Sequence, residues 1–290
     1  MSEENQNPYA ARNPDGTAAT PAAPAAVQNP YAAPKAQVAR AAEDTGQGEL
    51  IDGGRKVGAG RGAAWLGEGF DLFKQAPGVW VGITFVFFVV FFALALIPFI
   101  GQLAVNLLMP VFAAGLMLGC EALEKDEPLE LGHLFAGFKQ NTGQLVLVGL
   151  LYMLAIVVLI AAFFVVGLVI GFGAAATGAR GSSAGIGFVI GMVLFGLVGL
   201  LLIVPLAMAV WYAPALIIFH EQEPIPAMKQ SFAGCLKNIV PFLLYSIIGL
   251  VLAIVATIPL GLGWLVLWPV FIGSLYKSYR DIFCVGGGPD

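Results

Sequence analysis

The sequence predicts an all-α, polytopic membrane protein with six transmembrane helices, arranged as three repeats of an interfacial amphipathic helix followed by a helical hairpin. Three observations predict this fold. The chain of 290 residues is 59% hydrophobic and only 11% charged, whereas a soluble domain is about a quarter charged. Its charged residues avoid six long apolar runs, and short sequence landmarks recur along it. This composition argues against a soluble globular fold.

Six apolar runs contain no Asp, Glu, Lys or Arg and are candidates for membrane spans. A helix rises about 1.5 Å per residue and the hydrocarbon core is about 30 Å thick, so roughly 20 residues suffice. The third and fourth runs are longer, which predicts tilt, a break or an extension beyond the bilayer. The six runs are 79–97, 102–120, 144–171, 186–219, 239–258 and 260–276.

The loops between these runs alternate in charge. The loops after the first and fifth runs carry no charged residue, and the loop between the third and fourth carries only Arg180. All other Lys and Arg fall on the side of the two termini, and cytoplasmic loops collect these residues. We therefore expect both termini in the cytoplasm and the lipid bilayer as a partner. The formal net charge is −4 without a basic block, so nucleic acid is not an expected partner.

Residues 1–60 are rich in Ala, Pro and Gly and carry almost no large apolar side chains. Such a segment cannot bury enough surface to offset its chain entropy, and we predict a disordered cytoplasmic tail. The segment Asn7–Ala11 recurs as Asn29–Ala33 and contains the tail's aromatic residues, Tyr9 and Tyr31. The two copies are either a bivalent peptide ligand for a protein partner or a repeat within a low-complexity linker.

The membrane domain is expected over 61–290 and begins with an amphipathic helix. Trp65, Phe70 and Phe73 share one apolar arc of residues 61–75, and the pattern ends before Pro77. A helix of this kind next to a span is expected to lie in the membrane interface.

An amphipathic helix of the same kind recurs after the second and fourth runs, which predicts three repeat units over 61–126, 127–222 and 223–284. The second run of each unit also carries a proline in similar context, at Pro110, Pro205 and Pro269. Parallel repeats predict a pseudo-threefold arrangement about an axis along the membrane normal. The aromatic residues of the three amphipathic helices are expected to form an interfacial collar, made of Trp65, Phe70, Phe73, Phe135, Phe138 and Phe232.

Two segments carry a family resemblance. The stretch WLGEGFDLFK at 65–74, followed by Pro77, and the stretch YKSYRDIF at 276–283 resemble an uncharacterised family of proteobacterial multi-pass inner-membrane proteins over about 60–283. More loosely, the repeated plan is similar to the membrane domain of some bacterial glycerophosphodiester phosphodiesterases. The resemblance implies a bacterial inner membrane and no known activity. Because the chain lacks a soluble phosphodiesterase domain, no catalytic residue is carried over.

The sequence predicts no catalytic, cofactor or metal site. Glu130 and His133 have the Glu-x-x-His spacing of carboxylate-bridged metal sites, and His220 has acidic neighbours. The matching ligands from facing helices are missing, and Gly132 weakens the helix. No pattern places a nucleophile beside either histidine. We therefore expect no cofactor and no enzymatic activity.

Polar residues within the predicted spans leave two interpretations open. Gln102 and Asn106 lie one turn apart on one helix face, where they form either a polar path for a neutral solute or hydrogen bonds between helices. Gly167, Gly171, Gly187 and Gly191 are spaced by four residues within each run, which indicates close helix packing or a gate. The leading functional hypothesis is an interaction or envelope-organising protein, and the alternative is a carrier or channel for neutral or lipidic small molecules.

Overall fold

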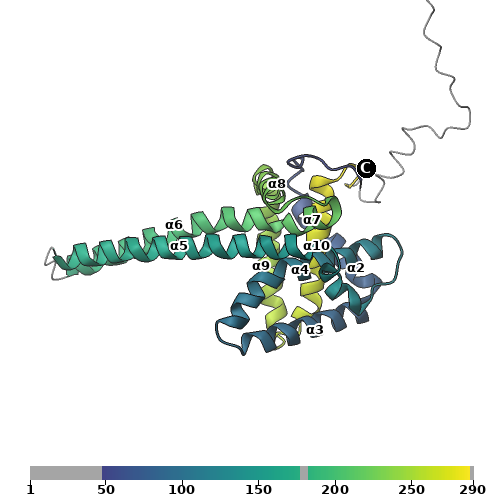
Figure 1. Ribbon diagram of the computed structural model, residues 1–290, viewed down its shortest axis with the longest axis horizontal. Helices are drawn as coiled ribbons and strands as arrows, with labels where there is room; N and C mark the ends of the chain where they lie inside the picture. Colours follow the sequence, from purple (N-terminus) through teal and green to yellow (C-terminus); the bar gives the residue numbers. More distant parts are fainter. Residues whose placement is uncertain (1–47, 177–181, 288–290) are drawn as a thin grey trace, which may run out of the picture. The chain divides into compact units, whose positions relative to one another are not determined.

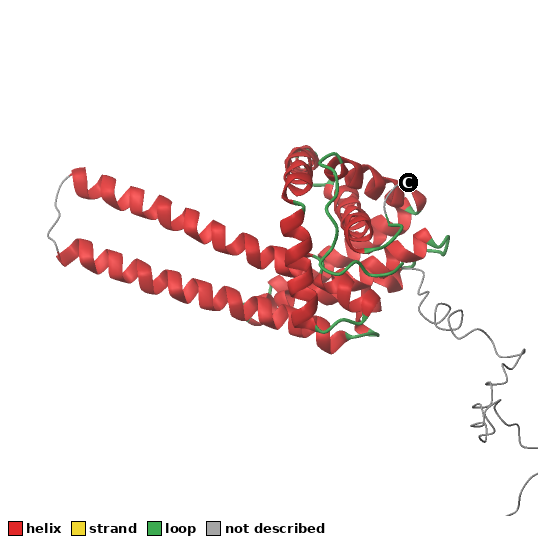
Figure 2. Cartoon of the chain, turned by 90° about the horizontal axis from the view of Figure 1, so that it is seen from above, coloured by secondary structure: helices red, strands yellow, loops and turns green. Residues whose placement is uncertain are grey.

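The computed structural model describes residues 48–176 and 182–287, and every named element in these ranges is a helix (Figures 1 and 2). Predictions about Tyr9, Tyr31, most of the tail and Arg180 fall outside the described residues. The elements are α2 (Arg61–Gln75), α3 (Pro77–Ala95), α4 (Ile100–Glu124), the 3₁₀ helix η1 (Leu131–Phe138), α5 (Thr142–Ala176), α6 (Ser182–Trp211), α7 (Ala213–His220), α8 (Pro224–Lys237), α9 (Ile239–Thr257) and α10 (Trp264–Phe283).

Five helical segments of the described chain are long and apolar enough to cross a membrane. They are Pro77–Ala95, Ile100–Glu124, Thr142–Val169, Phe195–His220 and Ile239–Thr257. The sixth predicted run lies in α10, which continues without a break from apolar residues into Lys277, Arg280 and Asp281. Because of this charged end, α10 has a shorter apolar stretch than the five segments above. The chain is a multi-pass α-helical membrane protein.

Prolines shape the helices that follow the hairpin turns. Pro110, Pro205 and Pro269 lie inside α4, α6 and α10, where each removes a backbone donor from the helical ladder. At Pro110 the carbonyl of Asn106 loses its helical partner, and Gly149 of α5 approaches that carbonyl so closely that an added Cβ would lie 2.7 Å from the oxygen. A glycine is required there because any side chain would separate α5 from α4.

The break between α6 and α7 has a specific cause. In a continuous helix the amide of Tyr212 would donate to the carbonyl of Met208. Instead, the Ser231 hydroxyl of α8 accepts a hydrogen bond from the Tyr212 amide at 2.9 Å and donates to the Met208 carbonyl at 2.6 Å. Pro214 then provides a helix start at α7. A side chain from α8 thus bridges the interrupted ladder.

The two N-terminal amphipathic elements pack on helices through glycines. Gly69 of α2 meets the backbone of α10, where an added Cβ would lie 2.4 Å from the Val270 carbonyl oxygen. Gly137 of η1 meets α4 in the same way, at 2.1 Å from the Val111 carbonyl oxygen. Val270 and Val111 each follow the proline of their helix. Small residues allow these backbones to approach closely.

The second amphipathic element is a 3₁₀ helix and not the expected α-helix. Its eight residues, Leu131–Phe138, include Gly132 and Gly137, and glycine disfavours a continuous α-helix by about 1 kcal/mol each. His133 accepts a hydrogen bond from the Glu130 amide through Nδ1 at 3.0 Å, which caps the first turn. The element remains amphipathic because Leu134 is buried while Phe135 and Phe138 are exposed.

Helices α5 and α6 form a long hairpin that extends away from the other helices (Figures 1 and 2). Most of its described side chains beyond residue 153 are exposed and apolar. The two helices meet where Phe163 packs at a tilt against Phe195, with ring centroids 4.2 Å apart, and where Phe163 also contacts Gly199. Gly167 and Gly191 have open space around them, so these two glycines do not mediate the contact between α5 and α6 that their spacing predicted.

Residues 48–60 correct the predicted boundary of the tail. This segment lies along the end of α10, with backbone hydrogen bonds from Ile51 to Phe283 and from Arg55 to Ile282 at 2.7 and 2.8 Å. Asn238 reinforces it, because its side chain accepts from the Val57 amide and donates to the Arg55 carbonyl, both at 2.8 Å. Composition predicted no order here because the segment is held by backbone hydrogen bonds to α10, about 230 residues away, and by the Asn238 side chain, about 180 residues away.

Candidate functional site

A cavity of about 710 Å³ lies where the spans converge, and it is the candidate functional site. Helices α3, α4, α5, α6, α9 and α10 all contribute to its wall, together with Pro214 at the start of α7. Cavities of about 300–1,000 Å³ are typical of small-molecule sites. Six aromatic side chains line this one, namely Phe87, Tyr152, Trp211, Tyr245, Trp268 and Phe271.

The polar groups of the cavity are few and uncharged. Its wall contains the amide of Asn106 and the hydroxyls of Tyr152, Tyr245 and Ser246, and no Asp, Glu, Lys, Arg or His. The Tyr245 hydroxyl is 3.1 Å from the Ser274 hydroxyl, so it already has a partner. A mostly apolar wall with a small number of polar groups is typical of sites that bind lipidic or neutral molecules.

The cavity reaches the apolar outer surface of the helices. Leu250 of α9 lines the cavity and is 64% exposed, and Trp211 and Met109 at the wall are 41% and 38% exposed. Phe87 and Leu116, in contrast, are buried beneath it. A molecule could therefore enter from the side that faces the bilayer without crossing a charged surface.

The structure separates the two residues of the predicted polar path. Asn106 lies at the cavity wall, where its side-chain amide donates to the Gln102 carbonyl at 2.8 Å. Gln102 is exposed and does not line the cavity. Only Asn106 of this pair contributes to the site, because Gln102 lies one turn closer to the start of α4.

The predicted collar is also divided between the surface and the interior. Trp65 and Phe73 are buried because the apolar face of α2 packs on α9 and α10 rather than on lipid. Phe70, Phe135 and Phe138 are 44%, 43% and 39% exposed. Phe232 of α8 is partly exposed. Amphipathic periodicity could not distinguish a face that meets protein from one that meets lipid.

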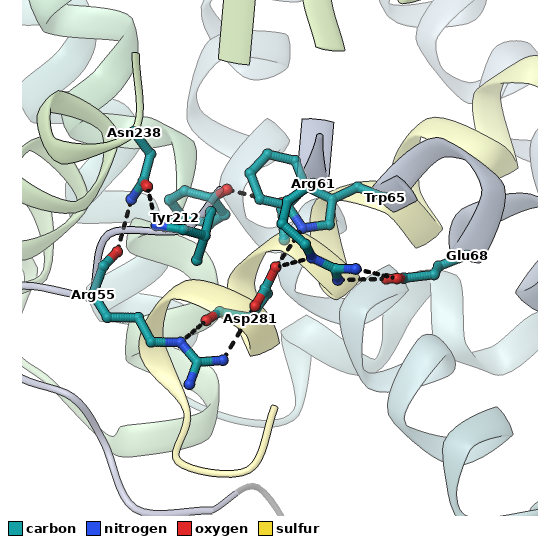
Figure 3. Close-up of polar contacts among 9 residues, drawn as sticks. Arg55, Arg61, Trp65, Glu68, Tyr212, Asn238 and Asp281 are labelled. Atoms are coloured by element: carbon teal, nitrogen blue, oxygen red, sulfur yellow. Dashed lines mark hydrogen bonds and ion pairs between the residues drawn. The ribbon is translucent and has the colours of Figure 1, made fainter. Parts of the chain in front are cut away.

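A buried carboxylate explains why Trp65 lies inside the protein. Asp281 of α10 accepts hydrogen bonds from Arg61 Nε at 2.5 Å, from Trp65 Nε1 at 2.9 Å and from Arg55 Nη2 at 3.1 Å (Figure 3). Glu68 holds the other side of Arg61, with 2.9 Å between Oε1 and Nη1. Arg55 comes from the segment before α2, whereas Arg61, Trp65 and Glu68 belong to α2 itself.

This arrangement is a polar latch, defined by Arg55, Arg61, Trp65, Glu68 and Asp281, between the two ends of the described chain. Burial lowers the pKa of the Arg61 guanidinium, but the hydrogen bonds and charges of Asp281 and Glu68 outweigh this effect and raise the pKa. The carboxylate is satisfied by partners within the protein, so the latch is a structural element with no open position for a substrate.

A second ionic group lies at the end of α4. Glu124 accepts a hydrogen bond from the Tyr276 hydroxyl at 2.8 Å and pairs with Lys277 and with Arg280, the latter at 3.4 Å. These contacts fix α10 against α4 and place charge at the ends of the helices. The cavity wall itself remains free of charged side chains.

The two histidines have local structural partners. His133 caps η1, as described above, and His220 is 2.7 Å from the Tyr279 hydroxyl through Nε2. Among the described residues, no group of three or more His, Cys, Asp and Glu is placed to hold a metal ion.

Sequence reasoning missed most of the cavity wall. Trp268, Trp211 and Phe87 are apolar or aromatic residues within apolar runs, and no local pattern separates them from core residues. One signal was available, because Pro110 and Pro214 line the cavity and Trp268 precedes Pro269 directly. Prolines within spans mark places where helices bend and leave space between them.

Comparison with known proteins adds a relative from a bacterium. The chain is 26% identical over 257 residues to a probable inner membrane protein of Burkholderia thailandensis, and the alignment covers 79% of this chain and 93% of the relative. No protein-family model matches the chain, and no solved structure matches it. With the apolar helices, this relative supports a multi-pass location in an inner membrane and the resemblance to uncharacterised membrane proteins. The likeness to the membrane domain of phosphodiesterases stays a prediction.

Proposed function

We propose that this chain is a non-enzymatic inner-membrane protein that binds a lipidic or other neutral small molecule in the cavity between its spans and carries it within the membrane. The observation that supports this function is the uncharged, aromatic-lined cavity of about 710 Å³. The exposed residues at its margin support entry from the bilayer. Because of this cavity, we favour a carrier function over an interaction role.

The proposed fold is a ring of three units with six membrane-embedded helices, in which α10 is the sixth. Each amphipathic element lies against the second span of the preceding unit, since η1 packs on α4, α8 packs on α6, and α2 packs on α10. The last of these contacts brings the first unit next to the third. Gly69 and Gly137, at equivalent contacts after a proline, support the same arrangement. The cavity would then lie about the pseudo-threefold axis.

The proposed orientation places both termini in the cytoplasm. The segment 48–60 pairs with the end of α10, so both ends of the described chain lie on one side together with Lys237, Arg280 and the latch. Lys and Arg collect on the cytoplasmic side of membrane proteins. Accessibility labelling of single cysteines placed at Lys56 and Leu260 tests this: only a cysteine at the Leu260 turn should react from outside the cell membrane.

The carrier function is tested by mass spectrometry of lipids that co-purify with the protein. We expect one uncharged lipid to be enriched over its share of the membrane from which the protein is extracted. Ala113→Trp should remove this enrichment, because Ala113 lines the cavity and an indole would occupy the space. Ala63→Trp, on the exposed side of α2, is the control. A lipid profile equal to that of the bulk membrane for the wild-type chain would contradict the proposal.

An interaction role at the cytoplasmic face is the second candidate, favoured by the exposed Phe70, Phe135 and Phe138 on amphipathic elements. These side chains are available to a protein partner or to lipid headgroups, and the tail motifs at Tyr9 and Tyr31 would add to such a surface. Crosslinking in cells with Phe70, Phe135 and Phe232 changed to Ser tests this role. Loss of a crosslinked partner is expected, and an unchanged set of partners would count against it.

A further inference from the structure

Two hydroxyl groups of the cavity wall differ from the other hydroxyl groups of the described chain. Tyr152 and Ser246 both line the cavity, and neither hydroxyl has a hydrogen-bond partner among the described residues. Every other Ser, Thr and Tyr whose side chain the structure describes has a partner for its hydroxyl within the protein. Thr84 and Thr257, for example, each donate to a carbonyl one turn earlier at 2.8 Å. The unpaired hydroxyl groups of the described chain therefore lie at the cavity.

Asn106 adds an acceptor to the same wall. Its Nδ2 donates to the Gln102 carbonyl at 2.8 Å, whereas its Oδ1 has no partner among the described residues. A side-chain amide oxygen can only accept a hydrogen bond. Asn106 and Tyr152 are partly exposed and Ser246 is exposed, and neither Asn106 Oδ1 nor the Tyr152 hydroxyl is a buried atom. A bound molecule can therefore reach these groups without a rearrangement of the protein.

The faces of the helices direct these side chains toward the cavity. The cavity-lining residues of α4 share one helix face, which consists of Asn106, Met109, Pro110 and Ala113. Tyr152 lies one turn after Gly149, where α5 comes against the backbone of α4 at Asn106. Ser246 lies one turn before Leu250, which also lines the cavity. An amide and a phenol at the contact between α4 and α5 and a hydroxyl from α9 thus face one cavity.

Building on the proposed function, on which this inference rests, we infer that the cavity binds an uncharged lipid whose head group carries free hydroxyl groups. The glycerol head of a monoacylglycerol is of this class. Each hydroxyl can both donate and accept, so such a head group can donate to Asn106 Oδ1 and accept from the hydroxyls of Tyr152 and Ser246. Its apolar chain would lie along the wall toward Leu250, which is 64% exposed where the cavity reaches the outer surface.

Other lipid head groups satisfy these three side chains less well. A head group with ether or ester oxygens alone offers no donor, so it would leave Asn106 Oδ1 without a partner in an apolar environment. A phosphate brings negative charge, and a buried phosphate requires cations or several donors. The described wall of the cavity contains no Lys, Arg or His. A head group with uncharged hydroxyl groups therefore matches this wall best.

Two photoreactive probes test the inference on the full-length protein in nanodiscs. Both are alkylglycerol ethers with the same diazirine-bearing chain, but one has two free hydroxyl groups and in the other these groups are methylated. Labelled peptides are mapped by mass spectrometry, and only labelling that an excess of the same lipid without its diazirine displaces is counted. We expect the diol probe to label the peptides of α4 and α9 that line the cavity, and the dimethyl ether probe to label them at least tenfold less.

The matched variants are Asn106→Leu and Gln102→Leu. Both remove an amide from the same span, but Gln102 lies outside the cavity. Loss of one hydrogen bond predicts about a tenfold higher diol concentration for half-maximal labelling in Asn106→Leu. Labelling by the dimethyl ether should not weaken, because this probe has no proton to donate to Oδ1. Gln102→Leu should label as the wild type does. Tyr152→Phe, which keeps the ring and removes the hydroxyl, should also weaken labelling by the diol about tenfold.

The outcomes separate the two proposals. Equal labelling of the cavity by both probes, or stronger labelling by the dimethyl ether, would refute the preference for hydroxyl groups while leaving the binding cavity in place. An unchanged half-maximal concentration in Asn106→Leu, or an equal increase in Gln102→Leu, would refute the role of the Asn106 oxygen. An unchanged value in Tyr152→Phe would refute the role of its hydroxyl. If neither probe gives displaceable labelling of a cavity peptide in the wild-type chain, the proposed function fails together with this inference.

Discussion

The latch at the ends of the described chain and the hairpin of α5 and α6 are stabilised in opposite ways. In the latch, Asp281 is 3% exposed and each partner is fixed by a defined hydrogen bond (Figure 3). Along the hairpin, side chains such as Val158 and Leu201 are 60% and 71% exposed, and an aromatic pair, Phe163–Phe195, joins the two helices. One region depends on directional contacts within the protein, and the other presents apolar surface to its surroundings.

The difference shows where lipid acts as the solvent. Acyl chains solvate Leu and Val as well as another helix does, so the hydrophobic effect gives little reason for the hairpin to bury these residues. The carboxylate of Asp281 has no such alternative partner, because it is buried, and it must be satisfied within the protein. Substitutions should therefore have large effects in the latch and small effects in the hairpin.

The largest effect is expected for Asp281→Ala. This change leaves Arg55, Arg61 and the Trp65 N–H without their shared acceptor, and removal of one partner from a buried ionic group costs about 3–5 kcal/mol. The measurement is thermal unfolding of the purified protein in mild detergent. Asp71→Ala is the matched control, because Asp71 is 64% exposed and pairs with Lys74, a contact worth at most about 1 kcal/mol. Equal unfolding temperatures for the two variants would contradict the role of the latch.

A smaller loss is expected for Gly69→Ala. The new methyl group would lie 2.4 Å from the Val270 carbonyl oxygen and would force α2 away from α10, which predicts a cost of about 1–3 kcal/mol. Gly67→Ala lies in the same helix with no atom within 4 Å and should stabilise it by about 0.5–1 kcal/mol. Thermal unfolding of both variants checks the prediction. Stabilisation by both changes would show that the contact between α2 and α10 is looser than described.

These contrasts explain how much of the fold could be predicted from the sequence. The apolar runs identified the helices, because a span must satisfy its own backbone and avoid charge over about 20 residues. Five of the six runs gave candidate spans. The periodicity of residues 61–75 correctly placed α2, but it could not show that Trp65 meets Asp281, which lies 216 residues away.

The candidate site was less accessible to sequence reasoning. The sequence singled out Asn106 because it is polar within a span, and the structure places it at the cavity wall. Gln102 is also polar within the same span, but it lies outside the cavity. The two residues are one helical turn apart, and only Asn106 lies at the level of α4 where the other helices enclose the cavity. Trp268 gave no local signal, since an aromatic residue within an apolar run resembles a core residue until its neighbours are known.

A pH-dependent effect of intermediate size is expected from Cys235 in α8. Burial raises the pKa of the Cys235 thiol from 9.0 to about 12. The thiol therefore ionises more readily in the unfolded chain, so its contribution to stability is complete below pH 9 and is lost as the pH rises from 9 toward 12. At pH 10 the loss is about 1 kcal/mol. Unfolding temperatures of the wild type and of Cys235→Ala at pH 7.5 and pH 10 measure it. The variant should lose less stability between the two pH values, and parallel losses would contradict the assignment.

The smallest effect is expected in the hairpin, for Phe163→Ala. Phe163 packs on Phe195 and Gly199, but lipid can fill the space that the ring leaves, so only the aromatic contact is lost, worth about 0.5–1.5 kcal/mol. The matched change in the region of the latch is Phe283→Ala, because Phe283 is fully buried and lies against Gly234, where no lipid can enter. That change should cost about 3–5 kcal/mol. Both are measured by thermal unfolding in nanodiscs, so that lipid is present. If Phe163→Ala destabilised the protein as much as Phe283→Ala, the hairpin would be held by protein contacts after all, and the contrast between the two regions would not hold.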